Sequence, residues 1–144
     1  MGWKPTDVVP ISSTGPTATL PPSKDGQIKV FQLSRTDTTA TVKAVLPADA
    51  TILGFLIFGA ASNAGTTATI SIGSTVAATE FVNGQDIKTA GGLVIPTSTV
   101  NPANVAQVET LPHGSDIQIW AKYAETGAAS SAGGPYKIAI WYVR

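Results

Sequence analysis

The sequence contains no cysteine, a single histidine and few charged residues. Without cysteine there is no disulfide framework and no thiolate metal site. Charged residues make up 12% of the 144 positions, about half of the roughly 25% that is usual in globular proteins. The 9 basic and 9 acidic residues give a formal net charge of +0. We therefore do not expect nucleic acid as a partner, because such binding depends largely on neutralising phosphates.

Long hydrophobic runs are also missing. The longest apolar run, residues 52–61, is far shorter than the ~20 residues that cross a bilayer. The opening residues, MGWKPTDVVP, lack the apolar core of a signal peptide. We expect a soluble chain without an export signal of its own and without a membrane partner.

Residue patterns that carry catalysis are scarce. His113 lies between Leu111 and Asp116 in the segment LPHGSD, but a Ser, a His and an Asp that are close in sequence do not make a triad. The segment is more typical of a turn before a strand. The acidic residues are scattered, without the spacing of a calcium loop or a glycosidase pair. We expect no catalytic residue, no cofactor and no metal site, although a hydrolase built on His113 is a third hypothesis.

The glycine-rich segment at residues 127–134, GAASSAGG, resembles a phosphate-binding loop only superficially. It lacks the spacing G-x-x-x-x-G-K-[ST] and a helix after it. We interpret it as a flexible loop between the last two strands.

What the chain does have is a series of short β-strands. Residues 68, 70 and 72 are aliphatic and alternate with the hydroxyl residues 67, 69 and 71, which places the aliphatic side chains in a core and the hydroxyls in water. Strands are predicted at residues 27–33, 39–45, 51–58, 66–72, 79–82, 93–95, 105–111, 116–123 and 136–143. The first two are expected to form a hairpin or a neighbouring pair, and Asn83-Gly84 is expected to be a tight turn. The pattern predicts an all-β fold, a jelly-roll-like antiparallel β-sandwich.

Aromatic residues gather in the last two predicted strands. They are Trp120, Tyr123, Tyr136, Trp141 and Tyr142, with Gln118 nearby. Exposed aromatics beside an amide are typical of glycan-binding sites, but we expect most of these rings to fill one end of the sandwich. For Trp141, a core position is favoured over an interface position.

The N-terminal segment differs from the rest in being rich in proline, serine and threonine. Proline favours extended backbone, so we divide the chain into an arm at residues 1–26 and a β-sandwich domain at residues 27–144. Fully extended, the arm would reach roughly 85 Å. It is either a tail, free or folded back on its own domain, or a segment that becomes ordered against a partner. Its partner-contact residues would be Trp3, Val8, Val9 and Ile11.

The central part of the chain resembles small virion proteins of tailed bacteriophages, in particular capsid decoration or cement proteins. The resemblance lies in residues 50–54 (ATILG), residues 62–73 (SNAGTTATISIG) and residues 81–91 (FVNGQDIKTAG), about a third of the chain. It implies a β-sandwich on the outer surface of the virion capsid, which bridges subunits of the major capsid protein. It also implies a homo-oligomer, either a trimer or a dimer, and supplies no catalytic residue.

The sequence thus favours a non-enzymatic virion structural protein that binds the outside of a phage capsid and stabilises it. The alternative is a receptor- or glycan-binding module of a phage tail or head fibre. Solvent-facing aromatic residues in a groove would favour the alternative.

Overall fold

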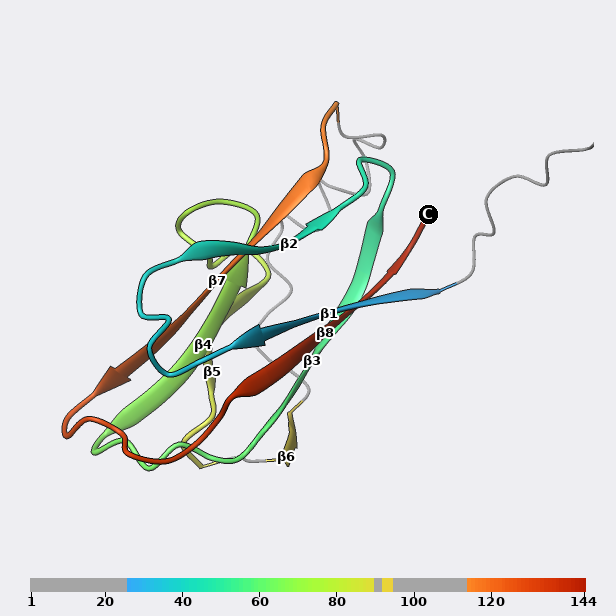
Figure 1. The fold of residues 1–144 in the computed structure, drawn as a ribbon. Coiled ribbons are helices and arrows are strands. Elements are labelled where there is room, and N and C mark those ends of the chain that lie inside the picture. Colours follow the sequence, from blue (N-terminus) through green and yellow to red (C-terminus); the bar gives the residue numbers. More distant parts are fainter. Residues whose placement is uncertain (1–25, 90–91, 95–113) are drawn as a thin grey trace, which may run out of the picture.

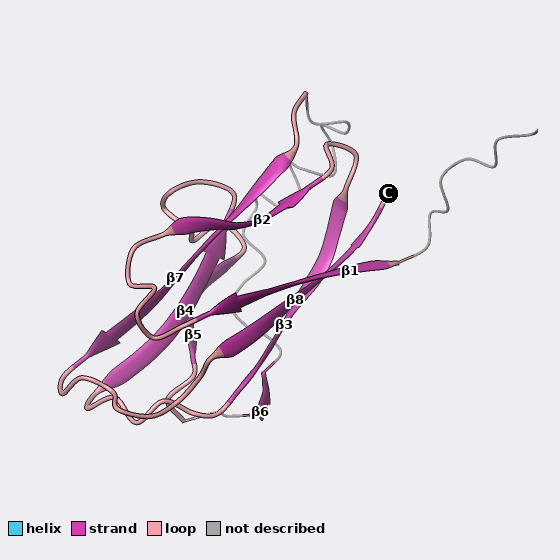
Figure 2. Ribbon diagram, in the orientation of Figure 1, coloured by secondary structure: helices cyan, strands magenta, loops and turns pink. Residues whose placement is uncertain are grey.

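The computed structural model describes residues 26–89, 92–94 and 114–144. Every regular element in these ranges is a strand, and the strands form two four-stranded antiparallel sheets (Figure 1, Figure 2). The strands are β1 (Gln27–Leu33), β2 (Thr41–Leu46), β3 (Thr51–Gly59), β4 (Thr67–Gly73), β5 (Val82–Asp86), β6 (Gly92–Val94), β7 (Ile117–Thr126) and β8 (Tyr136–Val143). No helix long and apolar enough to cross a membrane occurs in the described part of the chain.

The strand order is that of a jelly roll. One sheet has the order β1-β8-β3-β6 and the other the order β2-β7-β4-β5. The first four strands therefore pair in reverse order with the last four: β1 with β8, β2 with β7, β3 with β6 and β4 with β5. A long antiparallel ribbon that is rolled up in this way forms a two-sheet sandwich, which confirms the predicted fold class.

The core lies between the two sheets and follows from the period-two alternation of the strands. Ile138 and Ile140 of β8 are fully buried opposite Ile70 and Ile119 of the second sheet's strands, in one cluster of buried residues. Phe55 stacks on Phe81 with ring centroids 5.6 Å apart. The predicted core face of β4 is confirmed, because Ala68, Ile70 and Ile72 are all buried.

Two predictions about local pairing are wrong. β1 and β2 do not form a hairpin or a neighbouring pair; they lie in different sheets, because β1 pairs with β8 and β2 with β7. Asn83-Gly84 is not a tight turn but part of β5, which was predicted at residues 79–82. Gly84 has a φ of +67°, which glycine adopts without strain, and it lies where the β4–β5 register shifts between Ile70 and Ile72.

The hydroxyl side of β4 is also only partly in water. Thr67 is exposed, but Ser71 is buried, and its hydroxyl accepts a hydrogen bond from the Gly84 amide at 3.0 Å. Ser71 is buried and Thr67 is not because β5 covers Ser71. Alternation alone does not show which side chains a neighbouring edge strand will cover. The strand predicted at residues 105–111 lies outside the described residues.

An isoleucine-to-alanine substitution should destabilise the protein by different amounts on the two faces of the β1-β8-β3 sheet. Ile138→Ala removes a fully buried side chain and should lower the free energy of unfolding by about 2–5 kcal/mol. Ile28→Ala, on the exposed side of the same sheet, should lower it by less than about 1 kcal/mol. Urea unfolding followed by circular dichroism measures both, and equal losses would contradict this assignment of the faces.

Candidate functional surface

The described residues contain no cluster of three or more His, Cys, Asp or Glu side chains that could hold a metal ion. His113 lies outside the described residues, and Asp116 is an exposed residue directly before β7. The predicted arm contacts Trp3, Val8, Val9 and Ile11 also lie outside them. The surface that the structure describes must therefore be analysed from its shape and polarity.

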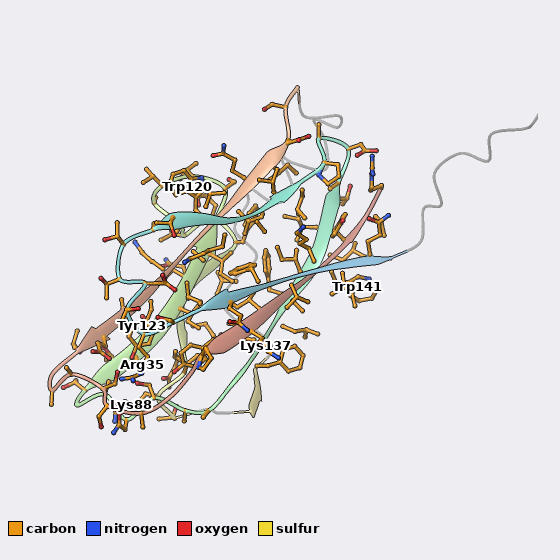
Figure 3. The ribbon with its side chains drawn as sticks, in the orientation of Figure 1. Arg35, Lys88, Trp120, Tyr123, Lys137 and Trp141 are labelled. Carbon is orange, nitrogen blue, oxygen red and sulfur yellow. The ribbon has the colours of Figure 1, made fainter. Side chains whose placement is uncertain are left out.

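One end of the sandwich is closed by polar contacts. The hydroxyl of buried Tyr123 donates to the Glu125 carboxylate at 2.5 Å and shares a hydrogen bond with the Ser62 hydroxyl at 2.9 Å. The Ser130 hydroxyl also donates to Glu125 at 2.5 Å, and Arg35 donates to the carbonyl of Ser130. These contacts join β7 to the β1–β2, β3–β4 and β7–β8 loops. Figure 3 shows Tyr123 and Arg35 at this end of the sandwich.

The glycine-rich β7–β8 loop is fixed at a second point. The side-chain carbonyl of Asn63 accepts hydrogen bonds from the amides of Ser131 and Ala132 at 2.9 and 2.8 Å. The loop begins at Gly127, which has a φ of +84°, and a Cβ there would lie 2.6 Å from the Thr66 hydroxyl. The segment that was interpreted as a flexible loop does connect the last two strands, as predicted, and hydrogen bonds hold it against the β3–β4 loop.

The carboxylates of this end are stabilised in their charged form. Hydrogen bonds from Ser130 and Tyr123 hold the pKa of Glu125 below its usual value, and the hydrogen bond from Lys43, whose ammonium lies 2.8 Å away, does the same for the pKa of Asp37. A general acid would need a raised pKa near the working pH. These carboxylates therefore behave as structural anchors of the loops.

A shallow cavity of about 240 Å³ lies beside these loops. Its lining residues are Ser34, Arg35, Thr36, Gly133, Gly134 and Pro135. The volume is below the roughly 300–1,000 Å³ of typical ligand pockets, and none of the lining residues is aromatic. It does not have the composition of a glycan site.

Most of the C-terminal aromatic residues lie inside the sandwich, as predicted. Tyr123, Tyr136 and Tyr142 are buried, and the rings of Tyr123 and Tyr136 stack at a centroid distance of 6.2 Å. The prediction for Trp141 is wrong: its side chain is exposed. Its β8 neighbours Ile140 and Tyr142 occupy the core side, so alternation directs Trp141 outward (Figure 3).

Trp141 is part of a larger exposed apolar surface. Three rows of residues face outward across β1, β8 and β3: Ile28, Trp141 and Gly54; Val30, Ala139 and Leu56; Gln32, Lys137 and Phe58. The exposed fraction is 67% for Ile28, 54% for Val30, 53% for Trp141 and 40% for Phe58, whereas Leu56 is half-buried and Ala139, in the middle of the set, is buried by its neighbours. We call this set of nine residues the Trp141 face. Lys137 is its one charged residue.

The outer side of the opposite sheet has a different composition. Its central strands β4 and β7 carry Thr67, Thr69, Ser71, Lys122 and Thr126 in paired positions, and the hydroxyls of Thr67 and Thr126 share a hydrogen bond of 2.7 Å. Polar side chains on the solvated face of an antiparallel sheet are the usual arrangement. Val42 and Val45 of the edge strand β2 are nevertheless exposed, and Val42 pairs with the half-buried Trp120 of β7. The Trp141 face differs in that its outward apolar residues extend over three neighbouring strands.

β1 adds an open edge to the Trp141 face. Among the described residues β1 is the terminal strand of its sheet, and two of its three outward residues, Ile28 and Val30, are apolar, the third being Gln32. Natural edge strands are usually protected by charges, prolines or bulges, because their unpaired backbone groups pair readily with other chains. β8 lies inside the sheet, between β1 and β3, so within the described part of the chain the edge beside the Trp141 face belongs to β1.

The chain matches no protein-family model and no curated protein sequence. A solved structure with a similar fold is a chain of the "Cyanophage Pam1 capsid asymmetric unit". The two chains superpose with a TM-score of 0.55 over 92% of this chain and 95% of the other, at 20% sequence identity. At that identity the comparison shows a common fold.

The lowered pKa values of Glu125 and Asp37 predict the pH dependence of stability. A carboxyl group whose pKa is lower in the folded protein stabilises it above the unfolded pKa, and this contribution is lost as the pH falls through the folded pKa. The melting temperature should therefore change little between pH 7 and about pH 5 and then fall below about pH 4.5. Differential scanning calorimetry of the wild type and of Glu125→Gln measures this, with Asp116→Asn as the matched control. An acid slope that is the same in all three proteins would contradict the role of Glu125.

Proposed function

We propose that this chain is a non-enzymatic virion structural protein that binds the outside of a phage capsid and stabilises it by bridging capsid subunits. The observation that carries the proposal is the Trp141 face, an apolar and nearly uncharged sheet surface on a well-packed jelly roll. Exposed apolar patches of this kind mark protein–protein contact sites. The common fold with a chain of a cyanophage capsid unit supports the same assignment.

The proposed contact has two parts. The Trp141 face docks on one subunit of the major capsid protein, and it loses little free energy to desolvation of charge because Lys137 is its one charged residue. The arm, residues 1–26, extends toward a neighbouring subunit or a second copy in a trimer or dimer. Trp3, Val8, Val9 and Ile11 are its proposed anchors. A single contact of this size is modest, but repetition over the capsid lattice makes the total stabilisation large.

A receptor- or glycan-binding module of a tail or head fibre is the second candidate, and the exposure of Trp141 is the observation in its favour. Sugar-binding sites combine an aromatic ring with polar groups that fix the ligand. In its row, Trp141 has the side chain of Ile28 on one side. The position on its other side is Gly54, which has no side chain. This apolar setting supports a protein contact more than a sugar contact.

Immunogold labelling of the virion that encodes this chain tests the proposed location. Electron microscopy should show gold distributed over the head, because a capsid-bridging protein occupies repeated lattice positions. Gold confined to the tail tip would contradict the proposal and favour the receptor-binding alternative. Preimmune serum is the control for background labelling.

Removing the Trp141 side chain should weaken capsid binding without unfolding the protein. An aromatic anchor that becomes buried in an interface is typically worth about 2 kcal/mol or more, so Trp141→Ala should reduce affinity for shells stripped of this protein by about thirtyfold. Thr69→Ala, on the opposite sheet, is the matched control and should bind as the wild type does. Co-sedimentation measures binding, and circular dichroism checks the fold. Undiminished binding by Trp141→Ala would show that this face is not the docking surface.

A further inference from the structure

The Trp141 face lies where the N-terminal arm joins the domain. β1 begins at Gln27, and a Cβ on the preceding residue, Gly26, would lie only 2.6 Å from the indole nitrogen of Trp141. Gly26, to which the 25 preceding residues are attached, therefore lies at a corner of this face, beside Trp141 (Figure 3). Those residues need not cross the molecule to reach it.

The arm is long enough to cover the face. The outward rows run from Ile28 to Gln32 along β1, a distance of about 13 Å at ~3.3 Å per residue. Even the nine residues from Trp3 to Ile11 would span about 30 Å when extended, and more than ten residues remain between Ile11 and Gly26 for the chain to turn back.

The composition of the arm complements that of the face. Four large apolar residues, Trp3, Val8, Val9 and Ile11, lie close together in its first half. Lys4 and Asp7 also lie among them, and Asp7, next to Val8, is the acidic group that the arm can bring to Lys137, the charged residue of the face. Lys137 forms no ion pair with any of the residues that the structure describes. The face of a second copy would instead bring another Lys137 and no acidic group, so charge favours the arm.

We propose that, in the free protein, the N-terminal arm folds back and covers the Trp141 face of its own domain. The contact is intramolecular, so the arm is present at an effective concentration in the millimolar range. It shields the apolar side chains and the open edge of β1 until a capsid subunit replaces it. The biological role of this shielding rests on the proposed function, whereas the contact between arm and face is a property of the isolated protein.

A nitroxide on the arm tests the contact in the purified full-length chain. Because the protein has no cysteine, Ser12→Cys provides one unique attachment point next to Ile11. In a ¹⁵N-labelled sample, the amide signals of Ile28, Val30, Ala139 and Trp141 should lose most of their intensity, and those of Thr67 and Thr69 on the opposite sheet should not. Uniform retention of all signals would overturn the proposal.

A mixed sample separates the arm of the same molecule from that of a second copy. Spin-labelled chain without ¹⁵N is mixed with unlabelled ¹⁵N chain, and no selective loss of signal is expected. Selective loss in this mixture would show that the arm lies on a neighbouring copy and would overturn the intramolecular contact. In the spin-labelled ¹⁵N chain, Ile28→Lys should restore the signals, whereas Thr69→Lys is the matched control that should not.

The outcome is independent of the shell-binding experiment. If the arm covers the face but Trp141→Ala binds shells normally, the proposed docking surface fails and the arm contact stands. If shell binding depends on Trp141 but the nitroxide leaves every signal intact, the arm contact fails and the docking surface stands.

Discussion

The position of β8 between β1 and β3 is the constraint on which the rest of the structure depends. β8 pairs with β1 over all seven of that strand's residues and with β3 on its other side. Its inward residues Tyr136, Ile138, Ile140 and Tyr142 are buried. A shift of one residue along the strand would exchange its two faces. Burial of these four side chains therefore forces Trp141 to the outside, together with Lys137 and Ala139.

Hydrogen bonds at the polar end of the sandwich hold the β7–β8 loop and so help to position β8. The loop that delivers β8 is held by Asn63 and Glu125, which lie on either side of the sandwich's end. Both anchors act on backbone or hydroxyl groups of residues 130–132. The loop needs such contacts because it is rich in glycine and alanine and offers little apolar area of its own. The register of β8, and through it the composition of the Trp141 face, is thus supported by hydrogen bonds at one end as well as by the core.

The alternation of single strands could be predicted from the sequence, whereas the pairing of strands could not. β1 and β8 were predicted with their observed bounds, and the inward residues of β4 were also predicted correctly. Alternation is a local property. The separation of β1 from β2, and the inclusion of Asn83-Gly84 in β5, depend on partners that are distant in sequence. Turn propensity at Asn83-Gly84 is outweighed by pairing with β4.

The Trp141 face shows the same limit for a functional surface. Alternation along β8 puts Tyr136, Ile138, Ile140 and Tyr142 on one side of the strand and Trp141 on the other. It could not indicate whether that second side is covered by another sheet. We predicted a core position for Trp141 because tryptophan is usually buried. Trp141 is exposed because, among the described residues, the sheet that contains β8 is covered on one side only.

The proposed contact between the arm and the Trp141 face would change what a partner must do to bind. A capsid subunit that competes with a tethered arm must bind the face more tightly than a segment present at millimolar effective concentration. Binding to a single capsid subunit in solution would then be weak. Binding to a capsid lattice would be stronger, because the lattice offers contacts to the face and to the released arm together. Since displacement of the arm frees the very segment proposed to reach a neighbouring subunit, docking and bridging become one coupled step. Trp141, at the corner where the arm leaves the domain, is the residue through which that coupling would act.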